Sequence, residues 1–480
     1  MLKKYFTIHP FIFSLLPLFH LYIVNFYEYP MFVILKPLIA LICLTFFSLI
    51  LLRLIINDKY KVSVIFSFSI LMIFVFNSYN EMFSKDFLRI LSFRCIFIIY
   101  LLFFLGILIF FIKTPLSLKK LSVFFNIAGL AISLFMFINS INVISEKKGN
   151  LVRDNQGDRI VLTHIAKKTY MPNIYYIILD SYPDKEEMKS IIGFDNSDFI
   201  NYLRMKGFFV ANKSRSNYNF TKLSIASTLN MNFLPMLKIA DNTYELKQKI
   251  VFSKAIEKSE VISFLKSLGY SYIDLSIWNN RFYNIDFTGS LLLMTPLSAP
   301  RIGNYICGLL LKNYVLDTLD KLERLTAPDE PFFVYAHIYI PHFPAMFDEN
   351  GDTPSFFKSD KKTLYLEQLK YTNKRIKKII DSILLNSKKK PVIIIQGDHG
   401  INSLTGDRDK NIRLRTSILN AVYIPESNEN VFYDGMTPVN TFRIIFNRYF
   451  GTDLKLLPDT TYYQDYEKGR LFVYKKNERQ

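Results

Sequence analysis

The chain has 480 residues, of which 50% are hydrophobic and 21% charged, and its formal net charge is +18. This apolar content excludes a disordered chain, and 19 Pro with 17 Gly are too few for a fibrous or low-complexity protein. Three Cys exclude a disulfide-stapled scaffold and a metal cluster built from cysteines. At roughly 150 residues per domain, the length suggests about three structural units.

The first 145 residues contain five apolar runs, each near the ~20 residues that cross a bilayer. Five such runs in succession argue against the core helices of a soluble protein. A cleavable signal peptide is disfavoured because the first run lacks a small-residue cleavage site. The third run is the weakest, because Asn77 and Asn80 shorten it. We expect transmembrane helices over 9–27, 31–56, 61–79, 92–112 and 121–143.

The positive residues in the loops predict the orientation of these helices. One side carries eight of them and the other side four. His9 and His20 fall within the first run, where we expect an interfacial or helix-packing role. This bias places the N-terminus in the cytoplasm and everything after residue 145 outside, in the periplasmic or extracellular space. The eight are Lys3, Lys4, Arg53, Lys59, Lys61, Lys113, Lys119 and Lys120, and the four are Lys36, Lys85, Arg89 and Arg94.

Residues 146–170 are polar and charged and are predicted to form a linker. Its lysines either rest on lipid headgroups or are simply solvated. The three predicted parts are therefore a membrane anchor over 1–145, this linker, and an exported domain over 171–480.

The exported domain alternates short β-branched or aromatic runs with helical stretches. This alternation predicts an α/β fold with a mostly parallel sheet flanked by helices. The predicted strands are 173–179, 208–211, 271–275, 331–338, 391–396 and 419–424. The predicted helices are 185–205, 221–229, 254–268, 303–325, 362–387 and 437–449.

Polar residues follow three of these strands, where ligands of such sheets bind. Asp180 follows the first, Asp398 and His399 follow the fifth, and the fourth runs into His337 and then His342. Asp and His at one sheet edge are ligands suited to Mn, Mg or Zn. Taken alone, Asp398-His399 could equally be a turn with an Asp cap and a surface histidine.

Thr221 begins a predicted helix. Its hydroxyl could be an N-cap, or a nucleophile at a helix terminus that favours a bound phosphate. Beside Asp180, Asp398 and His399 the nucleophile is favoured, because a metal can lower the pKa of a hydroxyl.

These segments together resemble the alkaline phosphatase/sulfatase superfamily, and within it the membrane-anchored branch similar to lipoteichoic acid synthases and phosphoethanolamine transferases. The resemblance covers residues 171 to about 460, and the five-span anchor fits the same branch. The matching segments are NIYYIILDSY (173–182), GFFV (207–210), SNYNFTKLSIASTLNM (216–231), HIYIPHFP (337–344), QGDHG (396–400) and RTSILNAVYIP (415–425).

The resemblance implies roles for single residues. Asp180, Asp398 and His399 would bind one divalent metal ion, Mn or Zn with Mg as a further option, and Asp180 stands where that branch often has Glu. Thr221 would be the metal-bound nucleophile. His337 and His342 would bind the transferred group or assist the leaving group, and Arg415 would contact an anion.

One departure narrows the expected chemistry. Sulfatases of this superfamily carry C/S-x-P-x-R, in which Cys or Ser matures to formylglycine. Here the segment reads Thr221-Lys-Leu-Ser-Ile, and threonine cannot form formylglycine. Sulfate-ester hydrolysis is therefore disfavoured.

We accordingly expect a multi-pass enzyme of the inner or plasma membrane that moves a phospholipid headgroup, phosphoglycerol or phosphoethanolamine. The group would pass through a threonine intermediate to an envelope glycan or lipid. One alternative is a phosphoesterase or sulfatase-like hydrolase with the same site. Another is a non-catalytic glycan-binding membrane protein. Nucleic-acid binding is disfavoured, because no DNA- or RNA-binding motif occurs.

Overall fold

A computed structural model describes residues 7–25, 29–83, 93–151, 171–240, 243–246, 252–276, 288–289, 291, 300–325, 331–358, 360–401, 404–425, 431–464 and 470–474. The chain forms two compact units. One comprises Met1–Val152 with Tyr283–Ile306, and the other Arg153–Phe282 with Cys307–Gln480. Lys3, Lys4, Lys85, Arg89 and most of the predicted linker, from 152 to 170, lie outside the described residues.

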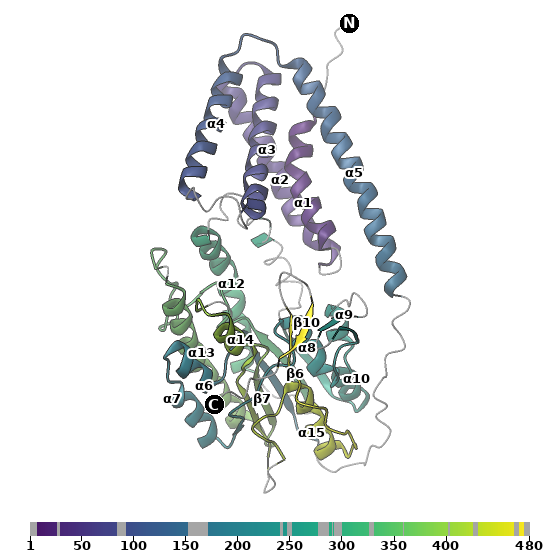
Figure 1. The fold of residues 1–480 in the computed structure, drawn as a ribbon, viewed down its shortest axis with the longest axis vertical. Helices are drawn as coiled ribbons and strands as arrows, with labels where there is room; N and C mark the ends of the chain where they lie inside the picture. Colours follow the sequence, from purple (N-terminus) through teal and green to yellow (C-terminus); the bar gives the residue numbers. More distant parts are fainter. Residues whose placement is uncertain are drawn as a thin grey trace. The chain divides into compact units, whose positions relative to one another are not determined.

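The N-terminal unit contains a helix at each predicted apolar run (Figure 1). Met31–Ile55 and Lys119–Ile141 are long and apolar enough to cross a membrane by length and composition, whereas His9–Ile23 and Ile98–Lys113 are shorter apolar helices. The five-span count therefore remains a prediction. The helices are α1 (His9–Val24), the short 3₁₀ helix η1 (Met31–Ile34), α2 (Leu35–Ile55), α3 (Lys59–Phe83), α4 (Phe93–Lys113) and α5 (Lys119–Leu151).

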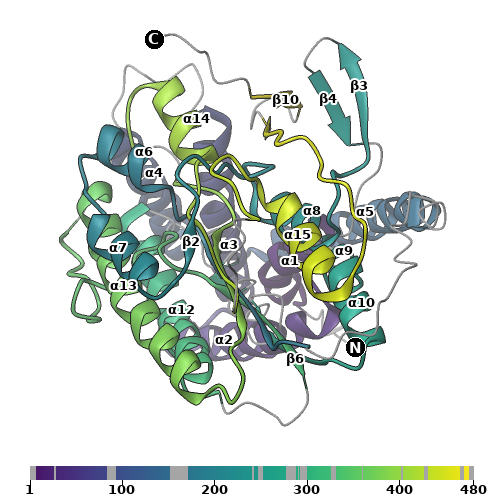
Figure 2. The ribbon, with the colours of Figure 1, turned by 90° about the horizontal axis from the view of Figure 1, so that it is seen from below.

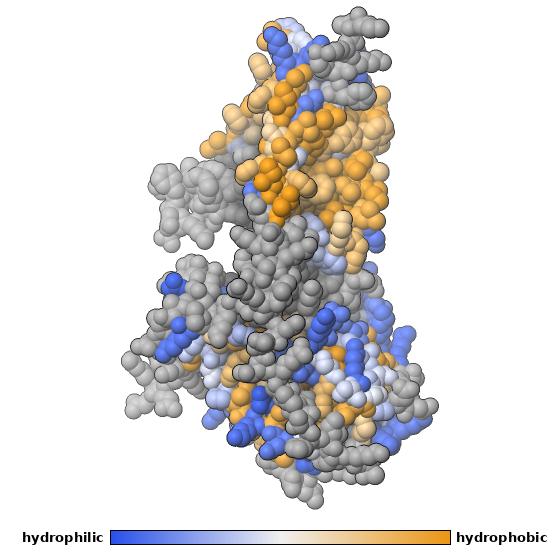
Figure 3. All heavy atoms as spheres, turned by 90° about the vertical axis from the view of Figure 1, so that its right-hand side faces the viewer, coloured by the Kyte–Doolittle hydropathy of each residue, from blue (hydrophilic) through white to orange (hydrophobic). Residues whose placement is uncertain are grey.

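Two of these helices extend beyond the predicted runs. Helix α3 continues through Asn77 and Asn80 to Phe83, and α5 continues to Leu151, into the range expected to be a linker. Large apolar side chains such as Phe46, Leu102 and Phe135 are more than half exposed on these helices. Figure 3 shows the resulting apolar surface.

A buried polar cluster joins three helices of the N-terminal unit. His9 of α1 lies 2.6 Å through Nδ1 from Ser67 Oγ of α3, and 3.0 Å through Nε2 from Ser122 Oγ of α5. Asn126 Oδ1 of α5 accepts hydrogen bonds from the backbone N–H groups of Ile8 and His9 at the start of α1. Both ring nitrogens of His9 thus have hydroxyl partners, as a helix-packing role requires.

The second unit is built on a six-stranded sheet of order β2-β8-β7-β1-β6-β5, and every strand in it was predicted. Pairs β1–β6, β1–β7 and β5–β6 are parallel, whereas β7–β8 and β2–β8 are antiparallel. The mostly parallel α/β sheet is therefore confirmed. The strands are β1 (Ile174–Leu179), β2 (Phe209–Val210), β5 (Ser271–Leu275), β6 (Phe332–Ile338), β7 (Val392–Gly397) and β8 (Asn420–Tyr423).

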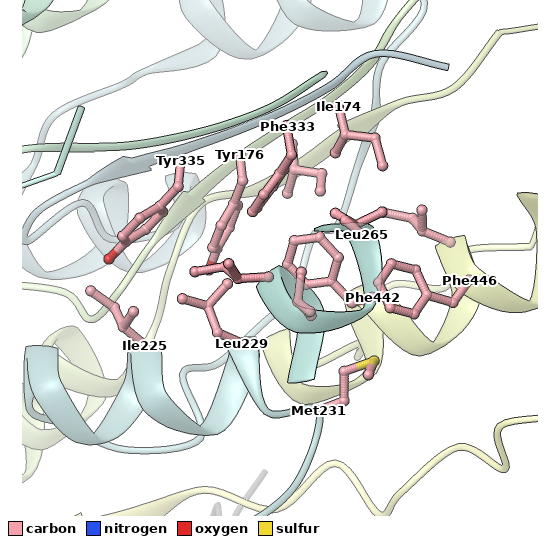
Figure 4. Close-up of a cluster of buried hydrophobic side chains, with 14 of the residues drawn as sticks. Ile174, Tyr176, Ile225, Leu229, Met231, Leu265, Phe333, Tyr335, Phe442 and Phe446 are labelled. Atoms are coloured by element: carbon pink, nitrogen blue, oxygen red, sulfur yellow. The ribbon is translucent and has the colours of Figure 1, made fainter. Parts of the chain in front are cut away.

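Helices cover both faces of this sheet (Figure 2). On one side lie α7 (Ser197–Met205), α12 (Pro300–Glu323) and α13 (Lys361–Asn386). The other side packs the main hydrophobic core, in which Tyr176 and Phe333 of the sheet meet Leu229 and Phe442 (Figure 4). Its helices are α8 (Thr221–Leu229), α9 (Phe252–Glu257), α10 (Glu260–Ser267) and α15 (Pro438–Phe450). Strands β1, β6 and β7 are buried along their whole length, which explains their continuous apolar runs.

Two predicted helices were wrong because each is interrupted. The expected helix 185–205 breaks at Gly193, whose φ of 74° ends the preceding turn. That segment contains α6 (Lys185–Glu187), the π-helix η2 (Met188–Ile192) and α7. The expected helix 254–268 divides into α9 and α10, because Ser259 begins a new helix at an extended backbone position.

The structure also contains elements that were not predicted. These are α14 (Arg408–Thr416) and a second sheet of order β3-β4-β10-β9. Its strands are β3 (Met236–Ala240), β4 (Thr243–Leu246), β9 (Tyr462–Gln464) and β10 (Leu471–Val473).

Candidate metal centre

Two neighbouring parallel strands bring the predicted carboxylates together. Leu179 of β1 pairs with Gly397 of β7, so Asp180 and Asp398 follow at the same sheet edge. Together with His399 they form a buried group in which one ligand atom from each residue lies within 4.8 Å of the others. The strand-end pattern thus led to a real spatial cluster.

The tautomer of His399 follows from its neighbours. Nδ1 lies 3.0 Å from the carbonyl oxygen of Gly400, which can only accept, so Nδ1 carries the proton and Nε2 presents a lone pair. That lone pair faces Asp398 Oδ2 at 3.2 Å and Asp180 Oδ1 at 3.8 Å. Two carboxyl oxygens and one imidazole nitrogen thus converge, and oxygen and nitrogen donors of this kind suit a divalent cation.

Thr221 lies at the first position of α8, and its side chain faces this cluster. Thr221 Oγ1 is 2.9 Å from His399 Nε2. The N-cap of α8 is Phe220, so the Thr221 hydroxyl does not fill the capping role that the sequence left open. The hydroxyl therefore adds an oxygen to the Asp180, Asp398 and His399 donors, at a helix N-terminus that favours anions.

Burial and nearby charges shift the pKa values of the two carboxyl groups in opposite directions. Burial, reinforced by the charge of Asp180, raises the pKa of Asp398 to about 7. Burial also opposes ionisation of Asp180, but electrostatic attraction to His342, followed by the hydrogen bond from His337, holds the pKa of Asp180 below the usual range. Burial, together with the charge of Arg415, lowers the pKa of His399, which keeps its imidazole neutral. A neutral imidazole and an ionised carboxylate are the forms that bind metal.

The two remaining histidines occupy different environments. His337 is fully buried in β6, and its Nε2 lies 3.2 Å from Asp180 Oδ2. His342 is partly exposed, and its Nδ1 donates to the carbonyl oxygen of Phe343, so Nε2 carries the lone pair. Its ring centroid lies 6.3 Å from that of His399. His342 is thus the more exposed of the two histidines, whereas His337 contacts a predicted ligand.

Arg415 is directed at the protein backbone. Its Nε donates to the carbonyl oxygen of Asn219 at 2.8 Å, and Nη1 donates to that of Gly400 at 3.1 Å. The guanidinium is buried and links the segment before Thr221 to the loop after His399. The Asn219 side chain in turn accepts from the backbone N–H of Gln464 in β9 at 2.7 Å and donates to its carbonyl at 3.1 Å.

The loop that carries Asp398 and His399 lies between two glycines that tolerate no side chain. A Cβ at Gly397 would lie 2.4 Å from the carbonyl oxygen of Tyr182, and one at Gly400 would lie 1.8 Å from that of Leu414. This close backbone approach fixes the two side chains between them.

Sequence reasoning missed two residues around this centre, Ser181 and Tyr365. Ser181 follows Asp180 directly and has a left-handed backbone with φ of 63°. Tyr365 of α13 donates from its hydroxyl to the carbonyl oxygen of Ser181 at 2.9 Å. No local pattern signals either role, because both depend on tertiary contacts.

Comparisons with known proteins identify a family. The sulfatase family model matches residues 172–446, which is more than half of the chain. No curated protein sequence matches the chain significantly.

Three of the solved structures to which this chain is similar have the following scores. The zinc complex of the C-terminal periplasmic domain of EcEptC from Escherichia coli has a TM-score of 0.42 and 10% identity, covering 65% of this chain and 94% of that one. The lipooligosaccharide phosphoethanolamine transferase EptA from Neisseria meningitidis has a TM-score of 0.38 and 13% identity, covering 87% of each chain. The lipoteichoic acid synthase LtaP from Listeria monocytogenes has a TM-score of 0.38 and 13% identity, covering 65% of this chain and 84% of that one.

Proposed function

The chain belongs to the sulfatase family, and we propose that it is a membrane-anchored, metal-dependent transferase of phospholipid headgroups. Its donor would be a phospholipid carrying phosphoglycerol or phosphoethanolamine, and its acceptor a glycan or lipid of the cell envelope. The N-terminus would lie in the cytoplasm and the catalytic domain on the periplasmic or extracellular side. An anchor of this kind would keep the domain near the membrane that contains its donor.

The observation that supports this proposal best is the position of the Thr221 hydroxyl. Its oxygen lies 2.9 Å from His399 Nε2, at a helix N-terminus and beside two buried carboxylates. Threonine cannot become formylglycine, so a sulfatase-family site with threonine here favours phosphoryl over sulfuryl chemistry.

Asp180, Asp398, His399 and Thr221 would hold the metal. A bound divalent cation would lower the pKa of the Thr221 hydroxyl and offset the negative charge of the phosphoryl group. We propose that this metal ion is Mn or Zn.

The chain's own residues would carry the transfer. Thr221 Oγ1 would form a bond to the donor phosphorus while the bond from phosphorus to the diacylglycerol oxygen breaks. The diacylglycerol oxygen would take up the proton that Thr221 Oγ1 loses, and the headgroup phosphate would remain esterified to Thr221. In the second half the acceptor hydroxyl would attack phosphorus, the bond from phosphorus to Thr221 Oγ1 would break, and the acceptor's proton would end on Thr221 Oγ1. His342 Nε2 has a lone pair, and burial lowers its pKa, so it can accept the acceptor's proton.

The test is mass spectrometry of the full chain after incubation with phosphatidylglycerol or phosphatidylethanolamine vesicles. We expect an adduct on Thr221 whose mass names the transferred group, and none in Thr221→Ala. Thr228→Ala is the matched control, because Thr228 lies on the same helix and its hydroxyl donates to the carbonyl oxygen of Ser224 at 2.9 Å. If the parent chain forms no adduct and Thr221→Ala keeps full turnover, Thr221 is not the nucleophile.

The same site could use water as the acceptor. Product analysis with labelled phospholipid, with and without a candidate glycan, separates the two reactions. Labelled glycan supports the transferase, whereas free headgroup phosphate in both arms supports the hydrolase.

A further inference from the structure

Ser181 contacts all three residues of the candidate metal centre. Its backbone N–H donates to Asp398 Oδ1 at 3.1 Å. Its hydroxyl donates to Asp180 Oδ1 at 3.3 Å and lies 3.4 Å from His399 Nδ1. The residue is 2% exposed, so these contacts are made away from solvent.

These contacts decide which atoms face the centre. Asp398 Oδ1 accepts from the backbone N–H groups of Ser181 and of His399, the latter at 2.8 Å. The other oxygen, Oδ2, is thereby left to face His399 Nε2 at 3.2 Å. The N–H of Ser181 reaches Asp398 from a left-handed backbone with φ of 63°. Such a conformation is uncommon outside glycine and persists where its surroundings hold it.

Tyr365, on helix α13, helps to keep Ser181 in this backbone conformation. Its hydroxyl donates to the carbonyl oxygen of Ser181 at 2.9 Å, and the whole side chain is buried. Burial raises the pKa of the Tyr365 phenol, so its oxygen keeps the proton that it donates. Helix α13 thus fixes the peptide between Ser181 and Tyr182.

We propose that Ser181 and Tyr365 are positioning residues that hold Asp180, Asp398 and His399 in the arrangement that binds a divalent cation. This inference rests on the proposed function, because it assumes that the cluster binds metal. Outer-shell partners of this kind typically change metal affinity by about 10–100-fold when they are removed.

The test measures Zn²⁺ and Mn²⁺ dissociation constants by competition titration of the full-length chain, with the melting temperature of the metal-free protein recorded in parallel. Ser181→Ala removes one oxygen and keeps the Cβ. Tyr365→Phe removes one hydroxyl. Tyr371→Phe is the matched control, because Tyr371 lies on the same helix and its hydroxyl accepts from Arg375, at 3.2 Å, away from the ligands.

We expect about tenfold weaker metal binding in Ser181→Ala and Tyr365→Phe, and less than a twofold change in Tyr371→Phe. The visible spectrum of the Co²⁺-loaded protein should shift in the first two variants only, because it reports the ligand geometry. If Tyr365→Phe fails to fold, Ser181→Ala decides alone.

Two results would count against different claims. If the parent chain binds neither Zn²⁺ nor Mn²⁺, the proposed metal-dependent function fails. If the parent binds metal and both variants match its affinity and Co²⁺ spectrum, only the positioning role fails.

Discussion

Each unit of this protein buries a histidine that uses both ring nitrogens, but the partners differ. His9 in the N-terminal unit lies between Ser67 and Ser122, whose hydroxyls can each donate or accept. His399 in the catalytic unit bonds a carbonyl through Nδ1 and directs Nε2 toward Asp398 and Asp180. The first cluster pairs ring nitrogens with hydroxyl groups, whereas the second gathers residues that could hold a metal ion. Burial of a histidine therefore does not by itself indicate a candidate metal site. Whether its neighbours can donate hydrogen bonds or can only accept them is more informative.

The largest expected effect separates the two histidines directly. His399→Ala should weaken Mn²⁺ or Zn²⁺ binding by at least about 100-fold, because it removes a predicted ligand and not only its support. Isothermal titration calorimetry measures this loss, and the headgroup-transfer assay should show inactivity. His9→Ala should keep the metal affinity of the parent. Equal loss in both variants would contradict the distinction.

The next largest effect is expected at Arg415, which links the segment before Thr221 to the loop after His399. Arg415→Met removes the Arg415 donor from the buried carbonyl oxygen of Asn219 and one of two donors from that of Gly400, which His399 Nδ1 also contacts, at a cost of about 2 kcal/mol. Thermal unfolding should show a lower midpoint even when the protein is metal-free. A variant that melts like the parent but has a raised KM would instead favour the anion contact expected from the sequence.

A buried carboxyl group of the catalytic unit outside the centre gives a pH-dependent test. Burial, with the charge of Glu187 contributing, raises the pKa of Asp184 to about 6, above the ~4 expected when unfolded. The protonated form stabilises the fold fully below about pH 4, and this contribution is lost as the pH rises through about 6.

Asp184→Asn keeps the acceptor that caps the Glu187 N–H and removes the charge. We expect it to raise the free energy of unfolding by about 2 kcal/mol at pH 8 and not at pH 4. Chemical denaturation at the two pH values measures the difference. The same gain at both would show that ionisation of Asp184 is not the cause.

The smallest expected effect lies in the N-terminal unit. His9→Ala removes two hydrogen bonds between helices, which are worth about 1–2 kcal/mol together in a membrane setting. The variant should melt earlier and keep its transfer activity. Lost activity with an unchanged melting temperature would assign His9 a chemical role.

The sequence was informative where burial is continuous or where polar residues end a strand. The six strands of the main sheet could be predicted because β1, β6 and β7 are apolar on both faces. Asp180, Asp398 and His399 could be selected because parallel strands end at one edge. The second sheet could not, because its short strands pair residues near 240 with residues near 470.

The remaining site residues illustrate the same limit. The hydrogen bond from the Tyr365 hydroxyl to the Ser181 carbonyl joins residues that are more than 180 positions apart in the chain. Arg415 was predicted to contact an anion because of the resemblance to the family. Its two backbone carbonyl partners are visible only once the loops are folded.

The Asn219–Gln464 pairing has a practical consequence for anyone defining the limits of this enzyme. The family match ends at residue 446, yet β9 lies beyond it and is held by the residue two positions before Thr221. A protein truncated at residue 446 would lose the strand that is bonded to the side chain of Asn219, two positions before Thr221. In this chain the family match therefore ends before β9, a strand that the unit uses to hold the segment preceding Thr221.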